Sequence, residues 1–429
     1  MTDLIIPGEA PAPAALKQSR LDSMARRTLL SMLNKLQHGT IRVIEGSRRW
    51  VFGKTHDADG LSATVSVHHP RFYNRILFNG SIGAAEAYME GLWSADDLTA
   101  VMRIMARNQT VFSQMEKGIA RLTAPLFRLY HLARKNTLSG SRKNILAHYD
   151  LGNDFYALFL DSTMTYSCGI FETRQCTLEA ASIAKYDRIC KKLQLKSGDR
   201  VVEIGTGWGG FALHAAQHYD VHVTTTTISN AQHRFAAERF REAGLQDRIT
   251  LLKKDYRDLK GHFDKLVSIE MIEAVGHQYF DTFFRVCSHL LKETGMMLLQ
   301  AITIRDQEFK RYIRSVDFIN RYIFPGGCLP SVAAMADAVS RVTDMKIFHL
   351  EDITPHYART LREWRRRFFS NIEAVRAMNF PESFIRMWEY YLCYCEGGFA
   401  EHVIGNVQML LTKPLCRRKP LLPHLAGSR

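Results

Sequence analysis

The segment VVEIGTGWGG at residues 201–210 is the strongest candidate for a ligand-binding site. Its apolar start predicts a strand, four glycines follow between positions 205 and 210, and the next residues, FALHAAQHY, predict a helix. Glycine lets a backbone turn sharply and approach a ligand where a β-carbon would clash. A strand, a glycine-rich turn and a helix in this order are typical of a nucleotide-type binding loop, so we expect a bound ligand here.

The spacing of the glycines fits two classes of ligand. Gly205, Gly207 and Gly210 match the GxGxxG pattern of dinucleotide enzymes. Gly205, Gly207 and Gly209 match the GxGxG pattern of S-adenosylmethionine (SAM) enzymes. A dinucleotide enzyme requires an acid at the end of its second strand for the ribose hydroxyls, but here that strand ends in TTTTISNAQ, which contains none.

Acidic residues near two other strand ends favour SAM. Glu203 stands two residues before the first glycine, where SAM methyltransferases typically carry an acid. The third predicted strand ends in Asp255, Tyr256 and Arg257, which offer an acid for the exocyclic amine of an adenine and a ring to stack on it. We therefore expect a SAM site at this loop.

The elements around the loop alternate between strand and helix. Seven segments predict strands: DRVVEIG, VHVTTTTI, ITLLKKD, FDKLVSIEM, MMLLQAITI, MKIFHLEDI and VIGNVQMLLTK. Helical stretches separate the first five, as a parallel doubly wound sheet requires. Predicted helices at 357–377 and 381–395 lie between the last two strands, and a helical insertion fills 306–343. The pattern predicts an α/β domain built on a seven-stranded sheet.

A smaller α+β region precedes this domain. Residues 21–36 predict a helix, and TIRVIEG with RRWVFGK predicts a hairpin. A turn signal at Asp59 and Gly60 follows, before the strand-like segment LSATVSVHH. The segment AAEAYMEGLW and residues 96–107 predict helices, and a basic helix at roughly 111–135 ends the region.

Most of the net charge of +14 is concentrated in two short segments. Residues 101–144 carry nine basic residues and one acidic residue, and the tail at 413–429 carries five basic residues and none that is acidic. Such blocks typically face nucleic acid or an anionic lipid surface, although a solvated face without a partner fits equally well. The polar stretch 135–144 is the predicted linker between an N-terminal domain at 1–134 and the α/β domain at 145–429.

The composition excludes several protein classes. Hydrophobic residues make up 46% of the chain and charged residues 23%, which excludes a disordered or collagen-like protein. No apolar run reaches the roughly 18 residues that span a bilayer, and the start lacks the pattern of a signal peptide, so we expect a cytoplasmic protein. The eight cysteines include no CxxC pair and no zinc-like spacing, so we expect reduced thiols and no metal site.

Eight segments resemble, in order, segments of the cyclopropane-fatty-acyl-phospholipid synthase family, which includes the mycolic acid cyclopropane synthases. They are HYDLGNDFYALFLDSTMTYSCGIF, VVEIGTGWGGFALHAA, TISNAQ, KDYRDL, SIEMIEAVG, RYIFPGGCLPS, HYARTLREW and CEGGFAEHVIGNVQ, and they span residues 148–408. A weaker resemblance covers 79–93. The resemblance implies a class I SAM-methyltransferase fold with a helical insertion that lines an acyl tunnel. It also implies a preceding domain that engages lipid.

The resemblance implies methyl transfer from SAM to a cis double bond of an acyl chain in a bilayer phospholipid, which forms a cyclopropane. An alkene is a weak nucleophile, so the two reactants must be held close together. The resulting carbocation must be sheltered from water, and a base must remove a proton from the delivered methyl group. In this family that base is a bound bicarbonate ion. The resemblance also implies peripheral binding to the inner face of an anionic membrane and allows a homodimer. The basic residues at 131–144 lack interleaved aromatic residues, so we expect no nucleic-acid partner.

The resemblance assigns the site residues by position. Around the ion it places Cys168, Glu273, Gln300, Ile302 and Tyr357. Cys395 matches a cysteine suspected of being a nucleophile in the family, but the mechanism requires no covalent intermediate, which favours a structural role. Around SAM it places Tyr166, Ser167, Glu203, Gly205, Thr206, Gly207, Trp208, Gly209, Thr227, Ser229, Gln232, Asp255, Tyr256 and Arg257. Of the two acids in SIEMIE, Glu270 and Glu273, one could simply cap the next helix, and the resemblance points to Glu273.

Two departures from the family pattern keep alternatives open. Gln300 and Ala274 stand where many bacterial members have histidines, and the motifs resemble the plant-type branch more closely. Gln300 can still donate a hydrogen bond through its amide, but it lacks a titratable charge. If the proton were not removed in the way that closes the ring, the product would be a methyl- or methylene-branched chain. A basic nucleic-acid- or lipid-binding protein without catalysis is the alternative from a different class.

Overall fold

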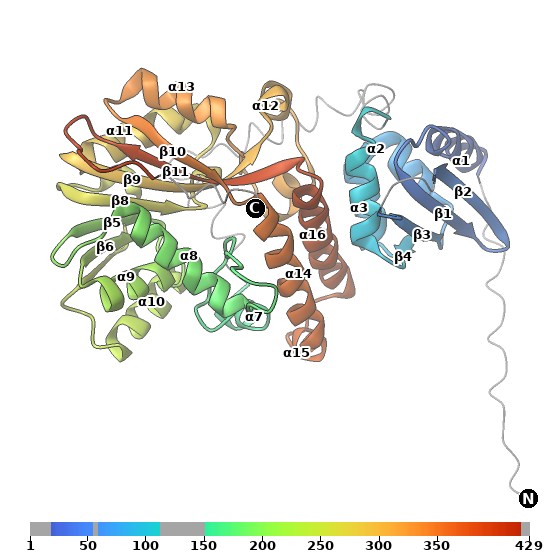
Figure 1. The fold of residues 1–429 in the computed structure, drawn as a ribbon. Coiled ribbons are helices and arrows are strands. Elements are labelled where there is room, and N and C mark those ends of the chain that lie inside the picture. The colour runs from blue at the N-terminus through green and yellow to red at the C-terminus, as the bar shows by residue number, and fades with distance from the viewer. Residues whose placement is uncertain (1–18, 55–58, 112–150, 422–429) are drawn as a thin grey trace, which may run out of the picture.

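The larger domain is built on a seven-stranded mixed sheet (Figure 1). The computed structural model describes residues 19–54, 59–111 and 151–421. The strands are β5 (Arg200–Ile204), β6 (His222–Thr226), β7 (Ile249–Leu252), β8 (Phe263–Ile269), β9 (Leu291–Ile304), β10 (Lys346–Asp352) and β11 (Ile404–Thr412), in the order β10-β11-β9-β8-β5-β6-β7. Strands from β9 to β7 are parallel, whereas β11 is antiparallel to β9 and β10. All seven predicted strands are confirmed.

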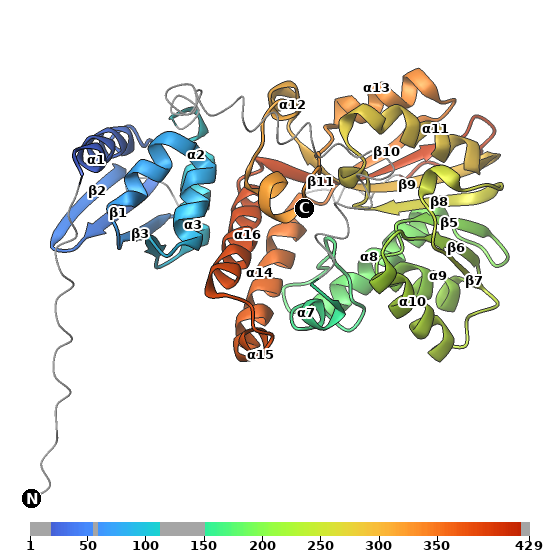
Figure 2. The same cartoon turned by 180° about the vertical axis from the view of Figure 1, so that it is seen from behind.

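Helices cover both faces of this sheet (Figures 1 and 2). One face carries α8 (Leu178–Leu193), α9 (Gly210–Tyr219) and α10 (Asn230–Glu242), and the other carries α11 (Phe280–Leu290) and α13 (Val332–Val342). Each face has its own apolar core, and central strand residues such as Val202 and Leu266 are fully buried. Burial on both sides explains why the central strands read as nearly continuous apolar runs. The predicted doubly wound fold is confirmed.

A group of helices extends from the carboxyl ends of the strands. It contains α7 (Asn153–Ala157), α12 (Asp306–Tyr312), a single π-helical turn at Ile319–Ile323, α14 (Thr354–Ser370), α15 (Ile372–Ala377) and α16 (Glu382–Ala400). The prediction of one helix over 357–377 is wrong, because the chain breaks at Asn371 between α14 and α15. The predicted end of the last helix at 395 is also wrong, because α16 continues through two glycines to Ala400.

The N-terminal domain is a four-stranded sheet covered by helices. Its elements are α1 (Arg20–Leu33), β1 (Gly39–Glu45), β2 (Arg48–Lys54), β3 (Ser62–Val67), α2 (Arg71–Met89), β4 (Trp93–Ala95) and α3 (Leu98–Arg107), with strand order β2-β1-β3-β4. The predicted hairpin of β1 and β2 is confirmed. The predicted helix through AAEAYMEGLW ends early, because Gly91, with a φ of 75°, turns the chain into β4.

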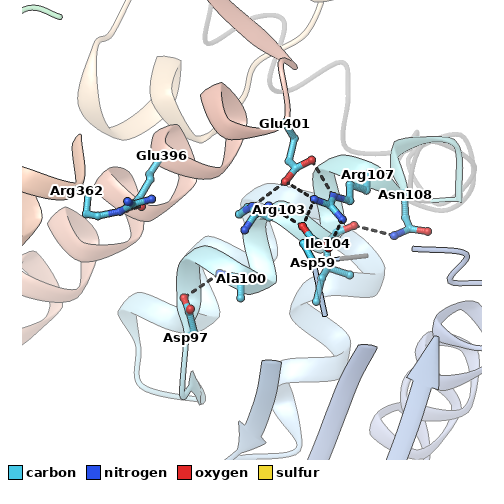
Figure 3. A network of polar contacts seen from close by, with 10 residues as sticks. All are labelled: Asp59, Asp97, Ala100, Arg103, Ile104, Arg107, Asn108, Arg362, Glu396 and Glu401. Carbon is cyan, nitrogen blue, oxygen red and sulfur yellow. Dashed lines mark hydrogen bonds and ion pairs between the residues drawn. The ribbon is translucent and has the colours of Figure 1, made fainter. Parts of the chain in front are cut away.

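The two domains meet where α3 packs against α16, which lies between the N-terminal domain and the large sheet (Figures 1 and 2). A β-carbon at Gly397 of α16 would lie 2.7 Å from the β-carbon of Met102, so this glycine permits the close approach of α3. Beside it, the carboxylate of Glu401 accepts hydrogen bonds from Arg103 Nε at 2.7 Å and Arg107 Nε at 2.8 Å (Figure 3). These contacts hold the N-terminal domain against the larger domain.

Several predictions lie outside the described residues. They are the loose N-terminal arm, most of the basic helix at 111–135 and the linker at 135–144. Within residues 19–54, 59–111 and 151–421, no helix combines the length and the hydropathy needed to cross a membrane.

Candidate active site

A cavity of about 1120 Å³ is lined by residues of both domains. Its walls include the glycine loop after β5, the segment that follows β8, and the inner faces of α14 and α16. In the N-terminal domain its wall is mostly apolar and includes Leu29, Ile41, Val65, Phe72, Ile76 and Met105. The predicted nucleotide loop and a large apolar chamber are therefore parts of one cavity.

The glycine loop approaches the cavity with its backbone in conformations that other residues rarely adopt. Gly205, Gly207 and Gly209 have φ values of 101°, 53° and 87°. A β-carbon at Gly207 would meet no atom within 4 Å, so a ligand can approach the backbone there. A β-carbon at Gly209 would lie 2.7 Å from the ring of Phe240, so this glycine serves the packing of α9 on α10.

Most predicted cofactor residues line the cavity. They are Tyr166, Ser167, Glu203, Gly205, Thr206, Gly207, Trp208, Thr227, Gln232, Asp255, Tyr256 and Arg257. Ser229 lies at the start of α10, where its hydroxyl accepts a hydrogen bond from the backbone N–H of Gln232 at 3.3 Å. The structure therefore places Ser229 and Gly209 at helix starts, outside the residues that line the cavity.

The acids at this end of the cavity are held by neighbouring residues. Glu203 is 2% exposed and accepts a hydrogen bond from the hydroxyl of Thr225 at 2.6 Å. Burial raises the pKa of Glu203 to about 8. The carboxylate of Asp255 accepts hydrogen bonds from Nε and Nη2 of Arg257, each at 2.7 Å. The carboxylate therefore forms an ion pair with the guanidinium group of Arg257.

Glu270 forms the centre of the other polar group in the cavity. Its Oε1 accepts hydrogen bonds from the backbone N–H of Cys168 at 3.0 Å, Gln300 Nε2 at 2.8 Å and Asn406 Nδ2 at 2.6 Å. Its Oε2 accepts the hydroxyl hydrogen of Tyr357 at 2.6 Å. An ionised carboxylate only accepts hydrogen bonds, so a charged Glu270 matches all four donors.

The backbone of Glu270 has a φ of 49°, in the left-handed region that non-glycine residues rarely adopt. Its N–H donates to the carbonyl of Gln300 at 2.8 Å, so backbone and side chain contact the same residue. Such strain persists only where the surroundings over-determine it and is concentrated at functional sites. The sequence carried one signal for this residue, because an acid directly after a strand of a doubly wound sheet faces the ligand crevice.

A chain of buried side chains fixes the donor that faces Glu270. The ammonium group of Lys192 donates to Gln408 Oε1 at 2.8 Å, and Gln408 Nε2 donates to Gln300 Oε1 at 3.0 Å. Since a lysine only donates, each amide must present its NH₂ group to the next residue, and Gln300 presents its own to Glu270. Gln300 and Gln408 are fully buried and pair in register between β9 and β11. The family resemblance indicated Gln300 but neither Asn406 nor Lys192.

Glu273 lies close to Glu270 but has a different environment. Its Oε1 accepts the backbone N–H of Ile302, and its buried Oε2 has no hydrogen-bond partner among the described residues. Burial, together with the negative charge of Glu270, raises the pKa of Glu273 to about 8. Near neutral pH one carboxyl group of the pair is therefore protonated, which is a pattern found at catalytic acid–base sites.

Comparison with known proteins assigns the chain to a family. A family model described as mycolic acid cyclopropane synthetase matches residues 136–409. The chain belongs to this family. It is a SAM-dependent methyltransferase that acts on fatty acyl chains by methylation or cyclopropanation, as the sequence predicted.

Two curated relatives match most of this methyltransferase. The tuberculostearic acid methyltransferase UfaA1 of Mycobacterium tuberculosis is 37% identical over 84% of this chain and 85% of its own length. The cyclopropane-fatty-acyl-phospholipid synthase of Escherichia coli (strain K12) is 39% identical over 82% of this chain and 88% of its own. Both matches are too long for the methyltransferase domain alone, so both include part of the N-terminal domain.

A solved structure matches the catalytic part. Mycolic acid cyclopropane synthase CmaA1, complexed with S-adenosylhomocysteine (SAH) and CTAB, is 33% identical with a TM-score of 0.59, and the match covers 63% of this chain and 98% of that one. SAM is thus the cofactor of this methyltransferase. The open backbone at Gly207 and the lining of the cavity fit it.

The residues of this methyltransferase do not fit the predicted bicarbonate ion. The N–H of Cys168, the amide of Gln300 and the hydroxyl of Tyr357 all donate to Glu270 instead. The N–H of Ile302 donates to Glu273. An added anion would find these donors in use and would stand beside the carboxylate of Glu270.

The two cysteines named as candidates have environments that disfavour a reactive thiolate. Cys168 is fully buried, and burial raises the pKa of its thiol well above the usual value. Cys395 lines the cavity, and burial raises its thiol pKa as well. Since the thiolate is the nucleophilic form, neither environment favours covalent catalysis, and Cys168 contributes its backbone N–H.

Proposed function

We propose that this methyltransferase acts on a cis double bond of an unsaturated acyl chain in a bilayer phospholipid and forms a cyclopropane ring. The observation that carries the proposal is the single cavity that includes the glycine loop, the Glu270 group and the apolar wall of the N-terminal domain. A polar cofactor at one end and a long apolar chain at the other need a cavity with these two kinds of wall.

The residues of the glycine end would hold the cofactor. The bare backbone at Gly207 lets the nucleoside lie against the loop, and the ring of Tyr256 offers a stacking face. The buried side chains of Thr227 and Gln232, which bond each other at 2.9 Å, present polar groups to the same part of the cavity. When bound, SAM supplies an activated methyl group and leaves as SAH.

The apolar wall would hold the acyl chain and exclude water. Aromatic residues Tyr390, Tyr391 and Phe399 of α16 line the cavity between the Glu270 group and the N-terminal domain. An apolar wall that excludes water protects a substrate carbocation from capture by water. The alkene would lie between the glycine loop and Glu270, the parts of the cavity that carry polar chemistry.

The N-terminal domain supports a phospholipid in a bilayer as the substrate. The relative named for phospholipid covers 82% of this chain, so its match reaches into this domain. In the described part of the basic segment, Arg103 and Arg107 are paired with Glu401 and Asp59. Attraction to an anionic membrane would therefore depend on the basic residues beyond position 111, and the enzyme would bind the surface peripherally.

A second product is favoured by one specific comparison. The relative that is 37% identical over 84% of this chain is named for tuberculostearic acid, a methyl-branched fatty acid. A methylene branch needs one step more than the ring: a 1,2-hydride shift moves the cation onto the carbon that bears the new methyl group before the electron pair of the broken C–H bond forms a double bond. The same site could therefore direct the cation to a methylene-branched chain.

Expression in a bacterial host that lacks cyclopropane lipids tests the proposal. We expect unsaturated acyl chains of phospholipids to gain one CH₂ unit, with ring-proton signals in the NMR spectrum that persist after mild hydrogenation. Vinylidene signals that disappear on hydrogenation would favour the methylene-branched product. Unaltered fatty acids in cells that contain folded protein would contradict both candidates.

A further inference from the structure

Glu270 occupies the place that the family resemblance assigns to an ion. We propose that the carboxylate of Glu270 is the proton acceptor of this methyltransferase and takes the role of a bound bicarbonate. The inference rests on the proposed function, since it names the base of that reaction.

The hydrogen bonds around Glu270 are those of an anion site that is already filled. Three of its four donors, from Cys168, Gln300 and Tyr357, are the groups expected to bind the ion. The fourth, Asn406 Nδ2, comes from β11 and makes a hydrogen bond of 2.6 Å. Because a carboxylate and a bicarbonate ion share the same planar O–C–O group, donors that fit one fit the other.

The position of Glu270 in the sheet places it next to the cofactor loop. Its strand, β8, pairs with β5, and Ser268 is opposite Ile204, directly before the first glycine of the loop. A β-carbon at Gly205 would lie 3.2 Å from the side chain of Met271, so the two strand ends are in contact. Glu270 lines the same cavity as this loop.

The two oxygens of Glu270 are not equivalent. Oε1 accepts three hydrogen bonds and is held by buried residues that do not line the cavity. Oε2 accepts one, from Tyr357, which lines the cavity together with Glu270. Oε2 therefore keeps the capacity to accept a proton, while Oε1 anchors the group.

The proposed step balances without a further reactant. After methyl transfer the acyl chain is a carbocation. One C–H bond of the new methyl group breaks, its electron pair forms the bond that closes the ring, and the proton binds Oε2 of Glu270. For a methylene product a 1,2-hydride shift first moves the cation onto the carbon that bears the new methyl group, and the electron pair of the broken C–H bond then forms a carbon–carbon double bond. Neutral Glu270 then returns the proton to water once the product has left.

Two titratable groups near Glu270 have shifted pKa values. Glu273 is neutral near pH 7, because burial raises its pKa to about 8. Lys185 is fully buried and donates to Ser167 at 2.7 Å. Burial lowers the pKa of Lys185 to about 8, and the charge of Glu270 opposes that change. The neutral form of Glu273 thus places no second negative charge beside Glu270, and a buried lysine lies nearby.

Glu270→Gln is the sharpest test because the structure can accommodate it. The amide oxygen can keep the three donors at Oε1, and the new NH₂ group can donate to the oxygen of Tyr357. We expect kcat with SAM and unsaturated phospholipid vesicles to fall by at least about 100-fold, with SAM affinity unchanged. Glu389→Gln is the matched control, since Glu389 accepts the hydroxyl of Tyr88 at 2.6 Å outside the cavity lining.

Glu270→Ala adds a readout that a purely structural role would not change. The shortened side chain leaves room for a small carboxylate, so added formate should restore turnover to the folded variant. Full activity of Glu270→Gln, or no rescue of a folded Glu270→Ala that binds SAM, would overturn the inference. Absence of product from the wild-type enzyme would instead remove the proposed function.

Discussion

The two ends of the active-site cavity are built in different ways. At the cofactor end, the wall of the cavity is formed by the backbone of the short glycine loop after β5, with open space at Gly207. The Glu270 end is assembled from side chains of β9, β11 and α14 together with the backbone of Cys168, and each of these groups donates a hydrogen bond to Glu270. The cofactor end has space for SAM to bind, whereas at the other end the carboxylate of Glu270 takes the place of a bound anion. A change of a few side chains can thus alter how the base is supplied without altering the fold.

The largest effect is expected at the cofactor end. Gly207→Val places a branched side chain in the open space of the loop and should abolish detectable SAM binding in calorimetry. Gly91→Val is the matched control, because Gly91 also has a positive φ and an open surrounding but lies outside the cavity lining. Equal loss of SAM binding in both variants would show that backbone strain, rather than the blocked space, is responsible.

A smaller effect is expected from Tyr357→Phe. The variant removes the only donor to Oε2 among the described residues and lets the carboxylate rotate, so we expect kcat to fall about tenfold with SAM affinity unchanged. Tyr219→Phe provides the control, since Tyr219 donates to Asp187 away from the cavity. An unchanged kcat in steady-state assays with phospholipid vesicles would mean that Oε2 needs no orientation by Tyr357.

The chain of amides behind Glu270 should affect stability more than rate. Gln408→Leu removes the donor to the buried Gln300 Oε1 and one acceptor of Lys192, which keeps its bond to Glu351. The unsatisfied amide oxygen should cost about 1–3 kcal/mol. Met409→Leu in the same strand conserves volume and should cost less than about 1.5 kcal/mol. Denaturant unfolding would measure both, and equal stability of the two variants would show that the amide chain contributes nothing.

The smallest effect is a change in how stability depends on pH. Glu273 has a folded pKa of about 8, above its unfolded value near 4.3, so the native state binds the additional proton between these values. Its contribution is present below about pH 4 and is lost as the pH rises through about 8. Glu273→Gln should flatten this decline in unfolding measurements, whereas Glu373→Gln, with a side chain 83% exposed, should not. Parallel curves for wild type and Glu273→Gln would contradict the assignment.

The cofactor end was predictable because its signals are local. The spaced glycines directly follow β5, Glu203 lies within that strand, Asp255 lies shortly after β7, and the predicted strands are all present. Family resemblance supplied Gln300 and Tyr357, but their partner at the centre of the site was not predicted. Glu270 is held by residues 87 and 136 positions away along the chain, Tyr357 and Asn406. Only the folded sheet shows that these groups meet.

The helix boundaries that were predicted wrongly have a similar cause. The predicted helix at 381–395 stops short of Gly397, but α16 continues through this glycine, which α3 packs against. The need for a small residue arises from the other domain, which local propensity does not report. Tertiary contacts decided both this helix end and the role of Glu270.

The most direct test of a built-in base is the bicarbonate dependence of the wild-type enzyme. Initial rates would be measured with SAM and unsaturated phospholipid vesicles in buffer freed of carbon dioxide, and again after bicarbonate is added. A carboxylate supplied by Glu270 predicts the same rate in both conditions. A rate that collapses without carbon dioxide and returns with bicarbonate would contradict it.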